Sequence, residues 1–235
     1  MTPLCVLAAL GLAGPGDFED LRLYIEVDLP SVPLGTRTID FSSLAAELSF
    51  EARAPVALRE LCILEPNGAE AMRLLQPNKT VSTREMSMEL EGGSLSTLKA
   101  EYPEGWYRVE ALTVKGELVT GSVRLEHKLP GPFAVLGPDP GVDVPFGENV
   151  TVAWTPSAGA TRYLLEVEND LAEFSINLAL PPSQTRFTLP GSLLVSSGEY
   201  DISLTVEGDT DNQLEFESRF TMGAQSVTST EKAAD

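Results

Sequence analysis

The sequence contains one histidine, two cysteines, and only 16 lysines and arginines against 35 aspartates and glutamates. A single histidine excludes most Ser-His-Asp triads and nearly all histidine-rich metal sites. The net charge of −19 leaves no basic excess that could release counterions from nucleic acid or hold an anionic membrane surface. We therefore expect no nucleic acid partner, and no cofactor.

No segment reaches about 18 apolar residues in a row, so we expect no membrane-spanning helix. A shorter apolar run extends from Pro3 to Ala13 and is broken at Gly14-Pro15-Gly16. It resembles the hydrophobic region of a secretory signal, although no lysine or arginine precedes Arg22. Residues 1–16 are predicted to be a signal peptide and the protein to be secreted or periplasmic; a buried N-terminal strand or helix is the alternative.

Cysteine usage gives one further expectation. Cys5 lies in the predicted signal, which leaves Cys62 alone in the apolar segment Leu61-Cys62-Ile63-Leu64. No internal disulfide is therefore expected in the mature protein. A lone cysteine in an apolar strand is usually a small buried side chain, so we expect Cys62 to be buried rather than to act as a nucleophile.

From residue 20 onward, apolar residues recur with a period of two, which is typical of half-buried antiparallel strands. In the second half, turn residues separate short strands roughly every 8–12 residues, as in a β-sandwich. The strands expected there are Phe133–Leu136, Val150–Trp154, Arg162–Val167, Phe174–Leu180, Thr185–Leu189, Tyr200–Glu207 and Leu214–Phe220.

Specific residues in this half resemble a fibronectin type III or similar immunoglobulin-like domain. Residues 150–156 resemble the second strand of that family, whose tryptophan, here Trp154, is a core residue. Tyr163 stands where the third strand carries a core tyrosine, and Leu193-Leu194 followed by Gly198-Glu199-Tyr200 resembles the tyrosine corner before the sixth strand. The resemblance covers residues 131–222 and implies an exported bacterial-type protein of this kind.

A related pattern occurs in the first half. Gly105-Trp106-Tyr107 precedes Gly198-Glu199-Tyr200 by 93 residues, which is the length of one sandwich domain, and both are followed by Thr-Val-x-Gly. We therefore expect an all-β fold of two tandem antiparallel β-sandwich domains. One short helix is predicted in the first domain, capped by Ser94 or Ser96 and ending before Pro103. The predicted organisation is a signal peptide at 1–16, an atypical sandwich at 17–130, a fibronectin type III-like domain at 131–223 and a flexible tail at 224–235.

The candidate binding residues are few. Trp106 points outward if Tyr107 faces the core, and beside Tyr102 it could stack on a sugar ring or anchor a protein partner. Its alternative is packing against the predicted helix or the second domain. His127 is expected to be structural or to face solvent, because no nucleophile or orienting carboxylate stands out.

Asp209, Asp211 and Asn212 have the composition of a calcium loop. However, Gln213 and Leu214 stand where the third ligand and the glycine of such a loop belong. A hairpin turn is therefore favoured over a calcium site, because Asp and Asn tolerate turn geometry. No other metal site and no catalytic residue are predicted.

Taken together, the sequence predicts a non-catalytic exported binding or structural protein built of β-sandwich modules, with a protein or a carbohydrate as partner. The alternative is a carbohydrate-active or other small hydrolase with its site in the first domain. That alternative requires a concave pocket with converging polar groups and a perturbed carboxylate. The oligomeric state stays open.

Overall fold

The computed structural model describes residues 18–30, 40–75 and 83–225. The predicted signal peptide and nearly all of the predicted tail lie outside the described residues. The chain divides into two compact units, the first comprising residues 1–28, 40–129 and 210–213 and the second residues 29–39, 130–209 and 214–235. One division between the units falls between Leu129 and Pro130. The domain bounds expected from the sequence stay a prediction.

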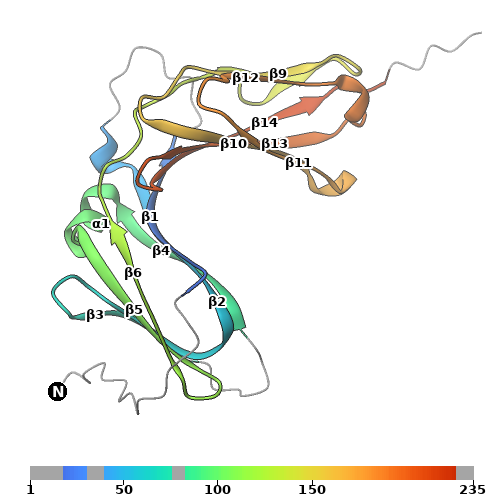
Figure 1. Cartoon of the computed structure of the whole chain (residues 1–235). Coiled ribbons are helices and arrows are strands. Elements are labelled where there is room, and N and C mark those ends of the chain that lie inside the picture. Colours follow the sequence, from blue (N-terminus) through green and yellow to red (C-terminus); the bar gives the residue numbers. More distant parts are fainter. Residues whose placement is uncertain (1–17, 31–39, 76–82, 226–235) are drawn as a thin grey trace, which may run out of the picture. The chain divides into compact units, whose positions relative to one another are not determined.

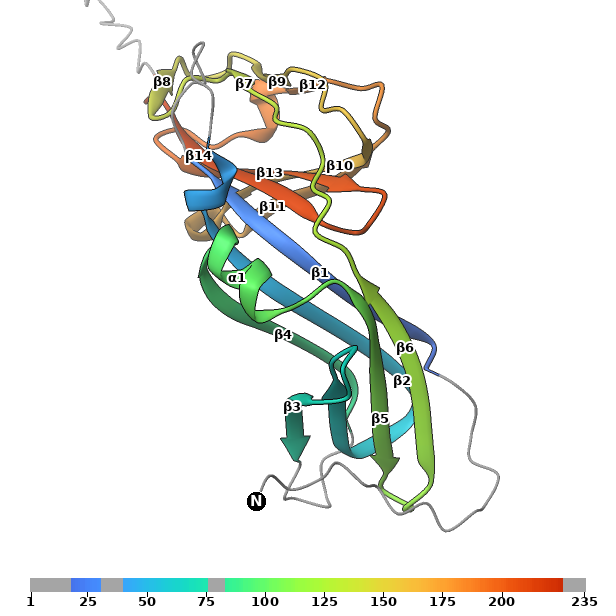
Figure 2. The same cartoon turned by 90° about the vertical axis from the view of Figure 1, so that its left-hand side faces the viewer.

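The first unit is organised around one long strand, β2 (Ala45–Leu64). Its first half pairs antiparallel with β1 (Asp20–Leu29) and β4 (Thr83–Ser94), and its second half with β3 (Glu70–Leu75) and β5 (Gly105–Thr113). β6 (Leu118–Leu125) pairs with β5, as Figures 1 and 2 show. A 3-10 turn, η1 (Phe41–Ser43), precedes β2, and the helix α1 (Leu95–Glu101) joins β4 to β5.

β2 changes partners near its middle, at Ala54-Pro55. The register with β4 shifts between Arg53 and Leu58. β2 is a strongly curved strand in Figure 1. Pro55 has no N–H to donate, so the strand loses a ladder hydrogen bond there, while the φ angle fixed by proline still fits an extended chain. A proline commonly interrupts a strand, but here one strand continues because the backbone stays extended through Pro55.

The short helix confirms the sequence prediction. The hydroxyl of Ser94 accepts a hydrogen bond from the backbone N–H of Thr97 at 3.2 Å, which caps the first turn. Leu95 and Leu98 face inward and are buried. They join a core of alternating strand residues that includes Ile25, Val27, Leu48, Phe50, Leu61, Val109, Ala111 and Leu125.

Cys62 lies in the second half of β2. The side chain is fully buried in β2, as expected, but it is disulfide-bonded, and no described cysteine is free. The expectation of an unpaired Cys62 concerns the chain without residues 1–16, whereas this structure is that of the full chain, so the expectation stays a prediction for the shorter chain. The other cysteine of the sequence, Cys5, lies outside the described residues.

The second unit consists of two facing sets of strands. β7 (Val135–Gly137), β9 (Val150–Trp154) and β12 (Arg186–Leu189) form one sheet in the order β12-β9-β7. In the other, β11 (Phe174–Leu180), β10 (Ala160–Asn169), β13 (Glu199–Gly208) and β14 (Gln213–Met222) lie side by side in that order. β8 (Val142–Val144) pairs parallel with β14, and the turns η2 (Asp170–Ala172) and η3 (Gly191–Leu193) link strands. The first, second and fifth predicted strands thus share one sheet and the remaining four the other, which is a Greek-key sandwich.

Aromatic side chains fill the core of this unit. Trp154, Tyr163 and Tyr200 are 2%, 0% and 0% exposed, which confirms their predicted core positions. The rings of Trp154 and Tyr163 meet edge-on with centroids 5.3 Å apart. Such a pair stabilises the core beyond the area that it buries, by about 0.5–1.5 kcal/mol.

The expected all-β sandwich fold with one short α-helix is confirmed for the described part of the chain. That the two halves are separate sandwich domains stays a prediction. The sequence does not predict β8, because a strand of three residues is too short to show a period of two. Among the residues that the structure describes, no helix has the length and apolarity needed to cross a bilayer.

Candidate functional site

Trp106 lies at the start of β5 and points away from the core. Its side chain is 63% exposed, whereas the neighbouring Tyr107 is 1% exposed and its hydroxyl donates a hydrogen bond to the carbonyl of Pro103 at 3.0 Å. Tyr107, Val109 and Ala111 are buried on alternate positions of β5. The period of two therefore fixes Trp106 on the outer face, as the sequence indicates.

Two arginines flank this tryptophan on the same face of the sheet. Arg124 on β6 is the direct cross-strand partner of Trp106, and Arg108 follows two residues later on β5. Arg108 pairs with Glu110 at 3.0 Å and Arg124 with Glu126 at 2.8 Å, while both arginine side chains stay mostly exposed. Trp106, Arg108, Arg124 and Ser122, the partner of Arg108, are called the Trp106 surface below.

Tyr102 lies close to Trp106 in sequence but has a different environment. It is the C-cap of α1, and its backbone N–H donates to the carbonyl of Leu98. The side chain is half-buried, and burial together with the carboxylates of Glu101 and Glu65 raises the pKa of its hydroxyl. Among the described rings, Tyr102 and Trp106 make no mutual contact, so only Trp106 offers a fully outward aromatic face.

His127, the only histidine, connects the end of β6 to the end of α1. Its Nε2 lies 2.8 Å from the carbonyl oxygen of Tyr102, and its backbone N–H donates to Glu104 Oε1 at 2.6 Å. The ammonium of Lys99 donates to the carbonyl of His127 at 3.0 Å. A carbonyl can only accept, so the ring nitrogen carries the proton in this contact. The residue thus has a structural role here.

Asn212, in the turn between β13 and β14, makes hydrogen bonds that the sequence does not predict. Asn212 is fully buried, and its Oδ1 accepts from the backbone N–H of Ile25 at 2.7 Å. Its Nδ2 donates to the carbonyls of Glu126 and Lys128 at 2.7 and 2.8 Å. The amide oxygen that a calcium ion would need is therefore already engaged. Asp211 has a left-handed backbone, with φ of 62°, as turn residues do.

The outer face of the second unit carries a shallow acidic groove of about 480 Å³ along β10, β13 and β14. Its lining includes Glu166, Glu168, Asp201, Glu215 and Glu217, with Arg219 as the cation. The negative charges of Glu166, Asp170 and Asp201, with some burial, raise the pKa of the Glu168 carboxyl. Like charges are therefore crowded on this face.

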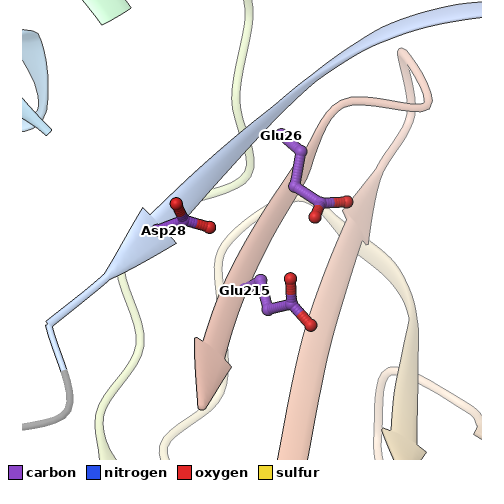
Figure 3. Close-up of side chains that lie close together, drawn as sticks. All are labelled: Glu26, Asp28 and Glu215. Carbon is purple, nitrogen blue, oxygen red and sulfur yellow. The ribbon is translucent and has the colours of Figure 1, made fainter. Parts of the chain in front are cut away.

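Acidic side chains also occur on β1 of the first unit. Glu26 and Asp28 are two positions apart and share a face of the strand, and Figure 3 shows them as sticks, together with Glu215 of the groove in the second unit. Both residues of β1 have interaction partners in the structure. Exposed carboxylates are common on strands that face water, so these residues alone do not indicate a metal site.

No family model matches the sequence, and no curated protein does. Among solved structures, the fibronectin(III)-like modules of Clostridium thermocellum CbhA show 9% identity over 88% of this chain and 93% of theirs, with a TM-score of 0.33. A segment of two fibronectin type III domains from chicken tenascin shows 15% identity over 87% and 99%, with a TM-score of 0.31. The fn3 domain of the human collagen alpha-1(XX) chain shows 15% identity over 44% and 91%, also with a TM-score of 0.31. The strand order of the two sheets defines the sandwich fold of the second unit.

Proposed function

We propose that this chain is an exported, non-catalytic binding protein built of β-sandwich modules, and that the Trp106 surface binds another protein. The observation that carries the proposal is the 63% exposure of Trp106 on a regular, well-packed strand. A tryptophan in such a position costs free energy in water and regains it when a partner covers the ring.

The neighbours of Trp106 favour a protein as partner. Tryptophan and arginine are the residues most enriched at the energetic centres of protein interfaces. Glu110 and Glu126 hold Arg108 and Arg124 by ion pairs, which reduces the entropy that these side chains lose on binding. The two arginine side chains are therefore ordered before a partner binds, while Trp106 stays exposed.

Export and the lack of a nucleic acid partner are parts of the same proposal. Export is supported by the apolar run from Pro3 to Ala13 and the small residues that follow it. The net charges of −7 on residues 1–130 and −12 on residues 131–235 would repel nucleic acid and anionic membranes. Sequencing the N-terminus of protein exported by its own cells tests the first point: we expect the chain to begin near Ala13 to Gly16.

A capture experiment tests the binding role. The full chain is immobilised and exposed to an envelope extract of the source cells, in parallel with Trp106→Ala and with Leu171→Ala as matched control. Leu171 is 99% exposed in the second unit, so this control removes apolar surface elsewhere without disturbing a core. We expect the same protein to be retained by the parent and by Leu171→Ala, and to be lost with Trp106→Ala.

Two outcomes contradict the proposal. Equal capture of the same proteins by the parent and Trp106→Ala shows that this surface is not the binding site. Retention of purified polysaccharide alone, abolished by Trp106→Ala, shows that the exposed ring stacks on sugars, and the partner is then a carbohydrate.

A further inference from the structure

β11 is a free edge of the larger sheet in the second unit. It pairs with β10 over seven consecutive residues, from Phe174 opposite Asn169 to Leu180 opposite Tyr163, with no register shift. Among the described residues it has no strand on its other side. A strand in this position presents a row of N–H and C=O groups that another strand can pair with.

This edge lacks the features by which proteins usually block such pairing. The strand reads Phe-Ser-Ile-Asn-Leu-Ala-Leu and contains no charged residue, no proline and no glycine. Two other outer strands of the described sheets differ: β6 carries Gly121 and Arg124, and β12 is four residues long and begins with Arg186. Charges, bulges and short length are the common protections of sheet edges, and β11 has none of them.

The sequence of β11 is also nearly symmetric about Asn177. If two copies pair antiparallel with Asn177 opposite Asn177, Ile176 faces Leu178 and Phe174 faces Leu180, each apolar side chain opposite another. On the other face, Ser175 lies opposite Ala179, so the exposed positions pair small residues with small residues. No charged group meets another anywhere along the strand.

We propose that β11 is a self-association edge, at which a second copy of this chain pairs antiparallel and extends the sheet across a two-fold axis. Such pairing satisfies the outer backbone groups and covers Phe174, Ile176 and Leu178, which are only half-buried. One strand pair makes a small interface by the standard of stable complexes, so the dimer dissociates on dilution. The net charge of −12 on residues 131–235 opposes association, so added salt strengthens it.

Sedimentation of the full chain over a wide range of concentration tests this inference. In Asn177→Lys, the two new ammonium groups face each other across the two-fold axis, and we expect association to weaken by about 2- to 5-fold. In Ser175→Lys/Ala179→Glu, each lysine lies opposite a glutamate of the other copy, so this variant should associate about as well as the parent. Thr120→Lys places the same charge on exposed β6 in the first unit and should leave association unchanged.

All three substituted positions on β11 are exposed, so the variants should fold, which circular dichroism checks. A monomeric parent at every concentration and salt level overturns the inference. An Asn177→Lys variant that associates as well as the parent also overturns it, because the copies then meet elsewhere. Loss of association in the Ser175→Lys/Ala179→Glu variant contradicts the antiparallel register.

Discussion

The hydroxyl of Tyr200 accepts a hydrogen bond from the backbone N–H of Val195 at 2.7 Å. The bond joins the start of β13 to the turn that precedes it, as expected for a tyrosine corner. The ring of Tyr200 is fully buried, stacks on Phe220 at 5.0 Å and meets Phe174 edge-on at 5.7 Å. The side chain of Tyr200 therefore packs in the core and also holds the loop that precedes β13.

Tyr200→Phe should lower the free energy of unfolding by about 1–3 kcal/mol, because the N–H of Val195 loses its partner while the core packing is kept. Val195→Ala is the matched control, since it keeps the backbone N–H and changes a side chain that is 45% exposed. Chemical denaturation measures both. Equal stability of Tyr200→Phe and the parent would show that this hydrogen bond contributes nothing.

Trp154→Ala should cost roughly 3–5 kcal/mol, because it leaves a cavity beside Tyr163 in the core of the second unit. Trp106→Ala removes the other tryptophan from an exposed position and should change stability by less than about 0.5 kcal/mol. Urea denaturation of both variants compares the free energy of unfolding lost at a core tryptophan with that lost at an exposed one. A change of under about 0.5 kcal/mol for Trp154→Ala would mean that β9 is wrongly placed.

Asn212→Ala should destabilise the protein by about 2–4 kcal/mol, because the backbone groups of Ile25, Glu126 and Lys128 lose their hydrogen bonds to the amide. Asp211→Gly is the control from the same turn: glycine adopts the left-handed backbone of this position readily, so little change is expected. Thermal unfolding followed by circular dichroism measures both variants. An Asn212→Ala variant as stable as the parent would contradict the structural role of this side chain.

Glu168→Gln should raise the melting temperature at pH 7. The pKa of Glu168 is raised in the folded state, chiefly by the charge of Glu166, so its ionisation opposes folding. Below the ordinary pKa of about 4.3, the Glu168 carboxyl is neutral in the folded and the unfolded chain, so the repulsion is absent. As the pH rises through the raised pKa of the folded state, Glu168 ionises and the repulsion lowers the stability of the fold. The advantage of the variant should therefore vanish below about pH 4 and shrink with added salt.

Glu148→Gln removes one negative charge from an exposed position of the same unit and serves as control. Calorimetry at the two pH values compares the variants. A gain for Glu168→Gln that persists unchanged at low pH would refute charge crowding as its cause.

Much of the second unit could be predicted from sequence, because its strands are short, half-buried and separated by turns. The resemblance to a fibronectin type III domain, together with period-two alternation, predicts Trp154, Tyr163 and Tyr200 in the core, and their burial confirms this. In the first unit, the pattern misled at Pro55: a proline usually marks a break, but β2 carries it in the middle of 20 residues. Which strands flank each half of β2 depends on non-local pairing that local periodicity does not encode.

The candidate sites were less predictable for a physical reason. Alternation around Tyr107 was sufficient to place Trp106 outward, but the arginine opposite it depends on the register of β6. The role of Asn212 depends on three backbone groups that lie 84 to 187 residues away in sequence. A turn composition of Asp, Thr and Asn gives no sign of such long-range hydrogen bonds.

The most direct test of the binding role is hydroxyl-radical footprinting of the chain with and without the captured protein. Free in solution, Trp106 and Leu171 should both be oxidised readily, because both side chains are exposed. In the complex, we predict that Trp106 is protected while Leu171 is oxidised as before. Equal oxidation of Trp106 in the free chain and in the complex would contradict the proposal that this surface binds the partner.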